Sequence, residues 1–321
     1  MRPALEEAID RLLPEVSRIL RYHLGWCDEH GRAAQLRGGR SLQAAMVMLA
    51  AEATGEDPQH AAVGAAAVEL IHTMTELYDD AFDGDDIRRD RPTAWRVFGT
   101  DITLLAGVTA ISEAFRLIAT APQGGREAAG LLGASLARVC GSYIHEVAFD
   151  SCDPRQISLP SLLDNAQEKG GELFGVGAQL GTVLCGHPVQ EAELLVTAAH
   201  HAGIAWSVAN DLEDIWGDAV LTGKRGGLDV KRRRHTPLVI LAMQSGHRDT
   251  SRLQELLSRP DLDDDHAEQM IKLVEDLGGR RAAETIVSEH LRKSLAAVDR
   301  LSLPAPLHRQ VRTLVQFAVT R

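Results

Sequence analysis

The chain has 321 residues, of which 45% are hydrophobic, 25% are charged and only 4% are aromatic. This length is enough to bury a large core, as one large domain or as two of ordinary size. The formal net charge of −11 argues against a nucleic-acid partner, because nucleic-acid-binding domains usually carry an excess of basic residues.

The first twenty residues, MRPALEEAIDRLLPEVSRIL, mix charged with apolar residues and contain no uninterrupted apolar run. They therefore predict neither a signal peptide nor a membrane span. The four cysteines form no CxxC pair and have no zinc spacing, which argues against a secreted fold built on disulfides. Together these features predict a soluble cytoplasmic protein.

Apolar residues recur at helical spacing along most of the chain, and an early stripe consists of Leu5, Ile9, Leu12, Leu13 and Val16. Runs of Val, Ile and Thr with strand alternation are absent. Glycine and proline breakers leave helices of about 15–25 residues, a length found in large bundles. No linker or shift in composition marks a boundary. We therefore expect an all-α helical bundle in which residues 1–321 form a single domain.

A first acidic cluster lies in the segment LYDDAFDGDDIRRDRPT, residues 77–93. On a helix, Asp79, Asp80 and Asp83 can share one face, and such close like charges are unfavourable unless a cation neutralises them. A hard cation such as Mg²⁺ binds through one or two carboxylates together with phosphate oxygens and water. Arg88 and Arg89 follow and suit a phosphate group.

Two other interpretations of this cluster are weaker. An EF-hand loop with Gly84 at its invariant glycine would place Ala81 where an oxygen ligand is needed and Asp90 where glutamate belongs. A solvated acidic helix end is also less favoured, because the carboxylates directly follow an apolar helical segment.

A second acidic cluster, ANDLEDIWGD, occupies residues 209–218. Asn210, Asp214 and Asp218 are spaced by four residues and can lie on one helical face, with Asp211 beside the first. A charged helix face explains this cluster equally well when it is taken alone. Two such clusters, each followed by basic residues, instead suggest opposed helices that hold several Mg²⁺ ions around a diphosphate.

These motifs resemble the trans-prenyl diphosphate synthases, and the DDxxD motif followed by an Arg pair is highly specific. The resemblance extends from the Gly38-Gly39 turn to the segment GGRRAAETIVSEHL and is strongest to bacterial geranylgeranyl diphosphate synthases, through DGDDIRRDRPTAWRVFG and IWGDAVLTGK. It implies an all-helical bundle of the isoprenoid synthase type with a central cavity, usually a homodimer. It also implies a prenyl diphosphate substrate and Mg²⁺, with three ions expected.

The resemblance implies roles for particular residues. Two motifs would bind Mg²⁺: Asp79, Asp80 and Asp83 in the first, and Asn210, Asp211 and Asp214 in the second. Three cations look like contacts of the allylic diphosphate: Arg88, Lys169 and Lys224. Two further residues look like part of the isopentenyl diphosphate site: Arg89 and His72.

The sequence departs from the family pattern mainly on the acceptor side. After the paired glycines the family has Lys and, three residues later, Arg, whereas those positions here look like Arg40 and Gln43. Losing a charge-assisted phosphate contact of this kind costs on the order of 1.5–3 kcal/mol, or roughly ten- to a hundredfold in affinity.

Further departures affect single motif positions. The family's Lys-Thr pair reads Lys169-Gly170, and its Phe-Gln pair near the acceptor alkene reads Trp206-Ser207. The histidine that usually precedes DDxxD is Tyr78, and the first Asp of the second motif is Asn210.

An enzyme that ionises an allylic diphosphate but binds isopentenyl diphosphate poorly could cyclise the cation, as class I terpene synthases do. The Asn210, Asp214 and Asp218 spacing partly resembles the second metal motif of those synthases, which makes Asp218 a further candidate ligand. Five aromatic residues are candidates for stabilising a cation: Tyr78, Tyr143, Phe149, Phe174 and Trp206. The low aromatic content counts mildly against a cyclase.

The pocket beneath the first motif is expected to be deep. Thr75 and Ile71 lie one and two helical turns below Asp79, and neither is aromatic. A chain of fifteen or twenty carbons should therefore fit, with twenty favoured.

The sequence thus predicts an Mg²⁺-dependent enzyme that ionises an allylic prenyl diphosphate, and a cyclase-like diphosphate lyase is placed first. A chain-elongating polyprenyl diphosphate synthase is the main alternative. Prenyl transfer to a non-isoprenoid acceptor and a non-catalytic partner subunit remain open as well.

Overall fold

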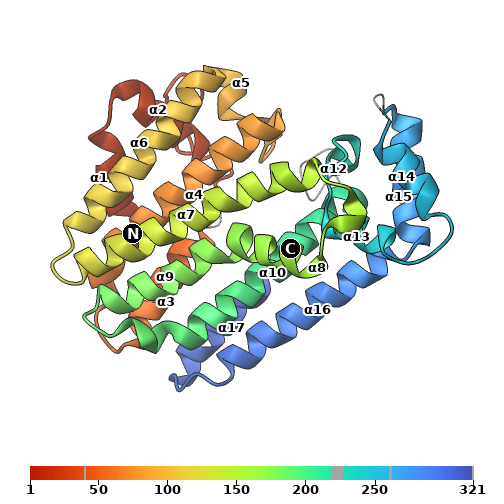
Figure 1. Cartoon of the computed structure of the whole chain (residues 1–321). Helices are drawn as coiled ribbons and strands as arrows, with labels where there is room; N and C mark the ends of the chain where they lie inside the picture. Colours follow the sequence, from red (N-terminus) through yellow and green to blue (C-terminus); the bar gives the residue numbers. More distant parts are fainter. Residues whose placement is uncertain (40, 218–226, 260–261, 320–321) are drawn as a thin grey trace. The chain divides into compact units, whose positions relative to one another are not determined.

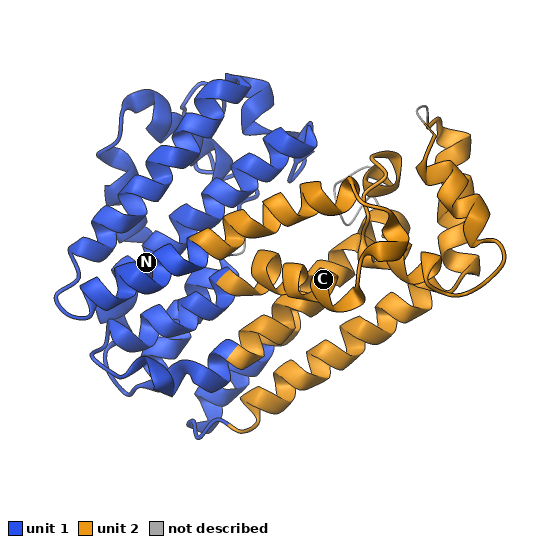
Figure 2. Ribbon diagram, in the orientation of Figure 1, with its two compact units in different colours: residues 1–136, 173–196, 301–314 blue, residues 137–172, 197–300, 315–321 orange. Residues whose placement is uncertain are grey.

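The computed structural model describes residues 1–39, 41–217, 227–259 and 262–319, and most of them are helical (Figure 1). The all-α class expected from the sequence is confirmed. The chain forms two compact units (Figure 2): residues 1–136, 173–196 and 301–314 make unit 1, and residues 137–172, 197–300 and 315–321 make unit 2. That residues 1–321 act as a single domain stays a prediction.

Unit 1 combines the first half of the chain with parts of later helices. Its elements are α1 (Arg2–Asp10), α2 (Pro14–His23), α3 (Leu42–Ala53), η1 (Pro58–Ala61), α4 (Ala62–Asp83), β1 (Ile87–Arg88), β2 (Arg91–Pro92), α5 (Ala94–Phe98), α6 (Thr100–Ala119), the start of α7 (Gly125–Asp150), most of α9 (Glu172–Val183), η4 (Val189–Ala192), the start of α10 (Glu193–Trp216) and most of α17 (Ala305–Val319).

The helix α4 is the centre of unit 1, because α1, α3 and α6 all pack against it. Its first turns are rich in small residues that allow this close packing, and Leu70, Ile71 and Leu77 are fully buried. The helix ends at Gly84, whose backbone adopts the left-handed conformation (φ 64°) that glycine tolerates best. The first acidic motif therefore occupies the last turn and a half of a helix that is fixed by its core.

The helix α6 is the single described helix that is long and apolar enough to cross a membrane, and 44% of its most apolar window is buried. It packs along α4 within unit 1. A core helix of a folded domain also meets this criterion of length and hydropathy. A second contact fixes the pair: the hydroxyl of Tyr78 donates a hydrogen bond to the Leu104 carbonyl at 3.1 Å, and the Tyr78 ring covers Gly107.

Unit 2 contains the remaining elements. They are the rest of α7, η2 (Pro154–Gln156), α8 (Leu159–Ala166), the π-helical segment η3 (Gln167–Gly171), most of α10, α12 (Leu228–Lys231), α13 (Pro237–Met243), α14 (Thr250–Leu257), α15 (Asp264–Asp276) and α16 (Gly279–Val298).

The core of unit 2 lies where α13 packs against α15 and α16, and Leu238, Val239 and Met270 are almost completely buried there. Two α-helices of this unit, α8 and α15, begin at a side-chain cap: Ser158 accepts a hydrogen bond from the Ser161 amide, and Asp263 from the His266 amide. Helices here are shorter than the 15–25 residues expected, except α7, α10 and α16.

Candidate active site

The first acidic motif lies at the carboxyl end of α4. Asp80 is 1% exposed, whereas Asp79 and Asp83 are half-buried one position before it and three positions after it. The loop that follows is tied to the helix, because the Asp85 carbonyl accepts hydrogen bonds from Thr93 Oγ1 at 2.7 Å and from Trp95 Nε1 at 2.9 Å. These bonds return the chain toward α4.

The returning chain is a short antiparallel hairpin that the sequence analysis did not expect. Ile87 pairs with Pro92 and Arg88 with Arg91, and Arg89 and Asp90 form the turn with φ of 53° and 62°. Two positive φ values match a type I′ turn, which is strained for residues other than glycine by about 1–3 kcal/mol each. The turn aims both arginines of the motif at α4.

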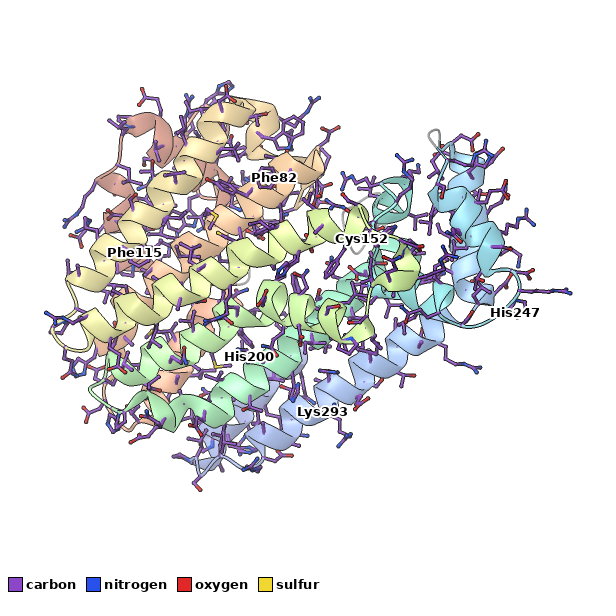
Figure 3. The ribbon with its side chains drawn as sticks, viewed as in Figure 1. Phe82, Phe115, Cys152, His200, His247 and Lys293 are labelled. Carbon is purple, nitrogen blue, oxygen red and sulfur yellow. The ribbon has the colours of Figure 1, made fainter. Side chains whose placement is uncertain are left out.

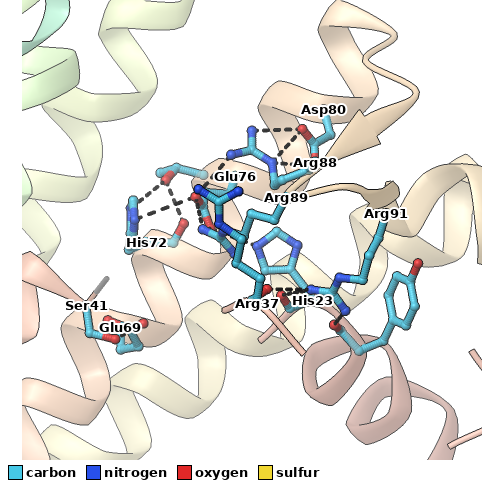
Figure 4. A network of polar contacts seen from close by, with 12 residues as sticks. His23, Arg37, Ser41, Glu69, His72, Glu76, Asp80, Arg88, Arg89 and Arg91 are labelled. Carbon is cyan, nitrogen blue, oxygen red and sulfur yellow. Dashed lines mark hydrogen bonds and ion pairs between the residues drawn. The ribbon is translucent and has the colours of Figure 1, made fainter. Parts of the chain in front are cut away.

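Arg88 binds the aspartate motif directly. Its Nε lies 2.8 and 2.9 Å from the two carboxylate oxygens of Asp80, and its Nη1 donates to Glu76 at 3.1 Å (Figure 4). Burial raises the pKa of the Asp80 carboxyl to about 7, although Arg88 acts in the opposite direction. Burial alone would lower the pKa of Arg88, but the Glu76 and Asp80 carboxylates hold it above its usual range.

Arg89 lies among the residues that the resemblance associates with isopentenyl diphosphate. Its Nη2 donates to both carboxylate oxygens of Glu76, at 2.5 and 2.8 Å. A Cβ on Gly39 would lie 3.0 Å from the same nitrogen, so the paired-glycine turn sits directly on this guanidinium. His72 Nε2 is 3.9 Å from Glu76 Oε1. Unit 1 therefore brings the glycine turn, His72 and Arg89 together.

Glu76 and His23 were missed by the sequence analysis. His23 Nε2 lies 2.8 Å from Glu76 Oε2, and His23 is 4% exposed. For Glu76 a signal exists, because positions 72, 76 and 80 repeat every four residues and share one face of α4. For His23 the local sequence holds none, since its partner is 53 residues away.

Other predicted residues of unit 1 are placed in its helices. Ile71 is fully buried, and Thr75 is buried with its Oγ1 donating to the His72 carbonyl at 2.8 Å. Phe174 is buried in α9. Gln43 is half-buried on α3, at a close approach to α9 where a Cβ on Gly177 would lie 2.9 Å from the Gln43 carbonyl oxygen. Their predicted contacts with substrate stay predictions.

In unit 2, Lys169 lies in the π-helical segment η3. Its Nζ is 2.9 Å from both carboxylate oxygens of Glu146 and 5.4 Å from the centre of the Tyr143 ring, so a carboxylate and an aromatic face hold the ammonium. Phe149 lies further along α7, where its carbonyl accepts a hydrogen bond from His235 Nδ1 at 2.7 Å.

The contact between η3 and α10 depends on three glycines. A Cβ on Gly203 would lie 2.1 Å from the Gly171 Cα, and a Cβ on Gly170 would lie 2.7 Å from the Gly203 carbonyl oxygen. The ring of Trp206 covers Gly170 in the same way, with Cε3 3.0 Å from that added atom. These contacts bring Lys169 to the helix that carries the second motif.

The second motif occupies the last two turns of α10. Asn210, Asp211 and Asp214 lie on this helix, and Asp214 Oδ2 accepts a hydrogen bond from the Asp229 amide at 3.1 Å. Burial and the nearby Asp229 carboxylate raise the pKa of Asp211 well above its usual value, while Lys169 acts against them. A buried carboxylate crowded by other carboxylates is what a bound cation would relieve.

Oxygen ligands of this type suit Mg²⁺. Within the described ranges no three His, Cys, Asp or Glu side chains converge on a ready-made metal position. Arg40, Asp218 and Lys224 lie outside the described residues. That the two motifs act on a single diphosphate stays a prediction.

Comparison with known proteins defines the class. The family model of the polyprenyl synthetases matches residues 25–274. The chain is 32% identical to a (2E,6E)-farnesyl diphosphate synthase of Mycobacterium tuberculosis, over 99% of this chain and 90% of that protein. It is 30% identical to a geranylgeranyl diphosphate synthase of the same organism, over 92% of this chain and 85% of that protein.

A solved structure supports the same family. A polyprenyl synthetase from Streptomyces coelicolor has the same fold, with a TM-score of 0.89 and 28% identity over 99% of this chain and 96% of that one. The chain belongs to the polyprenyl synthetase family of trans-prenyl diphosphate synthases, as its motifs predicted.

Proposed function

We propose that the protein is a prenyl diphosphate synthase that joins isopentenyl diphosphate to an allylic prenyl diphosphate and releases pyrophosphate. The observation that carries this proposal is the similarity over almost the whole chain to relatives named as such synthases. The order of the two main readings is thereby reversed. The cyclase-like lyase that the departures at Gln43 and Asn210 placed first becomes the second candidate, and chain elongation becomes the first.

The described residues fit Mg²⁺ as the metal. When bound, Mg²⁺ would neutralise the charge of the diphosphate and make pyrophosphate a better leaving group. The proposed ligands are Asp79, Asp80 and Asp83 in unit 1 and Asn210, Asp211 and Asp214 in unit 2. Support comes from the hard oxygen donors and from the crowding around Asp211. Three ions remain the proposed number.

The cations of the site stabilise the leaving group. When the C–O bond of the allylic diphosphate breaks, both electrons leave with pyrophosphate. The double bond of isopentenyl diphosphate then attacks the allylic cation, and the carbocation formed loses a proton to the released pyrophosphate, which restores a double bond. Arg88 and Lys169 supply positive charge where negative charge develops on the leaving oxygens. In this structure Asp80 and Glu146 hold these two cations. Substrate phosphate therefore competes with these carboxylates for the two cations.

We propose products of fifteen to twenty carbons, with geranylgeranyl diphosphate favoured. Relatives of both product lengths support this range. The side chains beneath the first motif on α4, Thr75 and Ile71, are small or aliphatic and buried.

The test is a two-substrate assay. The purified chain is incubated with Mg²⁺ and geranyl, farnesyl or geranylgeranyl diphosphate, each with and without labelled isopentenyl diphosphate. We expect longer diphosphates only when isopentenyl diphosphate is present, and loss of product with EDTA. Hydrocarbon or alcohol formed without it would restore the cyclase reading. No turnover, together with binding to a separate synthase, would indicate a partner subunit. Consumption of the allylic substrate only with a non-isoprenoid acceptor would indicate transfer to that acceptor.

We also propose that the protein is a homodimer and that α6 forms the contact. Ile102, Leu105 and Val108 are 38%, 63% and 49% exposed and recur every three residues, so they make an apolar stripe along this helix. Leu105→Glu should convert a dimer to a monomer in sedimentation velocity. A wild type that sediments as a monomer at micromolar concentration would contradict the proposal. The cytoplasmic location stays a prediction.

A further inference from the structure

Glu76 holds both arginines of the motif although it belongs to neither acidic cluster. Its side chain is 14% exposed and contacts Arg88, Arg89, His23 and His72 (Figure 4). Burial alone would raise the pKa of its carboxyl, but its neighbours, with Arg88 first, hold the pKa well below the usual range. Glu76 is thus an ionised carboxylate placed where the resemblance expects a diphosphate to bind.

The protonation of His23 supports this charge assignment. Burial lowers the pKa of His23 to about 4, although its hydrogen bond to Glu76 acts in the opposite direction. His23 is therefore neutral at pH 7. Because an ionised carboxylate only accepts hydrogen bonds, His23 Nε2 must carry the proton and donate to Glu76. His23 stabilises the anion without adding a positive charge.

Both arginines of the cluster already have carboxylate partners. Arg88 and Arg89 are two cations, and Glu76 and Asp80 are the carboxylates that bind them. A diphosphate that approaches Arg89 therefore meets a guanidinium whose Nη2 is already bonded to both oxygens of Glu76. A phosphate that binds this guanidinium must displace the Glu76 carboxylate from Nη2, or share the guanidinium with it and lie close to its negative charge. The carboxylate cannot leave the site, because α4 carries it.

We propose that Glu76 is a specificity-determining residue: an internal competitor that weakens binding of the second diphosphate at Arg89 and His72. The proposal rests on the proposed function, since it concerns the acceptor of that reaction. It acts in the same direction as Gln43, which lacks the charge that the family places nearby. Acceptor affinity in this chain is then set by a carboxylate as well as by a missing arginine.

Glu76→Gln tests the charge while keeping the shape and a hydrogen-bond acceptor for both arginines. The probe is inorganic pyrophosphate titrated calorimetrically into the full chain at pH 7.5 without divalent metal. We expect Glu76→Gln to bind it about tenfold more tightly than the wild type, because one repelling charge is removed from a charge-assisted contact. Glu76→Met, of similar length and uncharged, should shift the affinity in the same direction.

The matched control is Glu113→Gln on α6. Glu113 is also buried and forms two hydrogen bonds with an arginine, Arg116, but it lies outside the cluster. Pyrophosphate affinity in this variant should stay within about twofold of the wild type. Adding Arg89→Gln to Glu76→Gln should abolish the gain, which assigns the effect to that guanidinium.

Unchanged or weaker pyrophosphate binding by a folded Glu76→Gln protein would overturn the proposal. An unfolded Glu76→Gln protein would overturn it too, since Glu76 would then serve stability. The binding assay involves no turnover and separates this inference from the proposed function. If the wild type elongates its substrate and the affinity does not change, only the inference fails. If binding tightens but the wild type does not elongate, only the proposed function fails. In an active enzyme, Glu76→Gln should lower KM for isopentenyl diphosphate about tenfold and change kcat less.

Discussion

Replacing Gly203 by alanine tests how unit 2 positions its part of the site. In Gly203→Ala the new Cβ would lie 2.1 Å from the Gly171 Cα and 2.2 Å from the Gly171 nitrogen. Carbon atoms in van der Waals contact lie about 3.5–4.0 Å apart, so η3 and α10 would have to separate by about 1.5 Å. Both atoms belong to the backbone, and no side-chain rotation can relieve the overlap.

The expected loss of stability follows from two opposing effects. Overpacking a well-filled contact costs typically 1–3 kcal/mol, and a backbone clash of this size should reach about 3 kcal/mol or more. Alanine in a helix gains about 0.5–1 kcal/mol over glycine. The net expectation is a loss of at least about 2 kcal/mol in the free energy of unfolding.

The assay is urea unfolding followed by circular dichroism, with Gly141→Ala as the matched control. Gly141 lies in α7 within the same unit, and a Cβ there would meet nothing within 4 Å. This control should gain about 0.5–1 kcal/mol, because only helix propensity changes. The two Gly-to-Ala changes should therefore shift stability in opposite directions. A Gly203→Ala protein as stable as Gly141→Ala would refute the reasoning.

Two further predictions concern unit 1. Asp80→Asn should lower kcat at least a hundredfold under saturating Mg²⁺, because it removes a carboxylate that holds Arg88 and that we propose as a metal ligand. Asp86→Asn, at an exposed aspartate beside the same loop, should change kcat less than threefold, and equal effects would contradict the role of Asp80. Burial lowers the pKa of His23 to about 4, so the unfolded chain binds a proton near pH 6.5 that the folded chain does not bind. The contribution of His23 to the free energy of unfolding is therefore complete above pH 6.5 and is lost as the pH falls toward 4. Urea unfolding at pH 7 and pH 4 measures this loss in the free energy of unfolding. The loss should be about 3 kcal/mol larger in the wild type than in His23→Gln, and an equal loss in both proteins would contradict the prediction.

The last turns of α4 show what helical spacing alone predicts correctly. Phe82, labelled in Figure 3, lies within the DDxxD motif and is 63% exposed, while its neighbour Asp80 is buried. Helical spacing separates these two faces correctly, because positions two apart point in different directions around a helix. The end of α4 at Gly84 is readable in the same way, since only a local backbone preference is involved.

Tyr78 has contacts that the pattern does not predict. Its position next to DDxxD made it a candidate for contact with substrate, which stays a prediction, and its hydroxyl and ring contact α6 at Leu104 and Gly107. The hairpin that carries Arg88 and Arg89 was also unexpected, because Arg89 has no preference for a positive φ and Asp90 is not followed by the glycine that usually completes a type I′ turn.

The sequence by itself determined the helices, the carboxylate and arginine motifs and the family, because periodicity and motif spacing are properties of neighbouring residues. Only the tertiary structure decided which carboxylate each cation meets: Glu76 for Arg89, Glu146 for Lys169, and His23 behind Glu76. Ion pairs in a folded chain join residues that are far apart in sequence, and their partners are chosen by how helices pack. In this protein the packing that chooses them depends on glycines such as Gly39 and Gly203, which let backbones and guanidinium groups approach where any side chain would keep them apart.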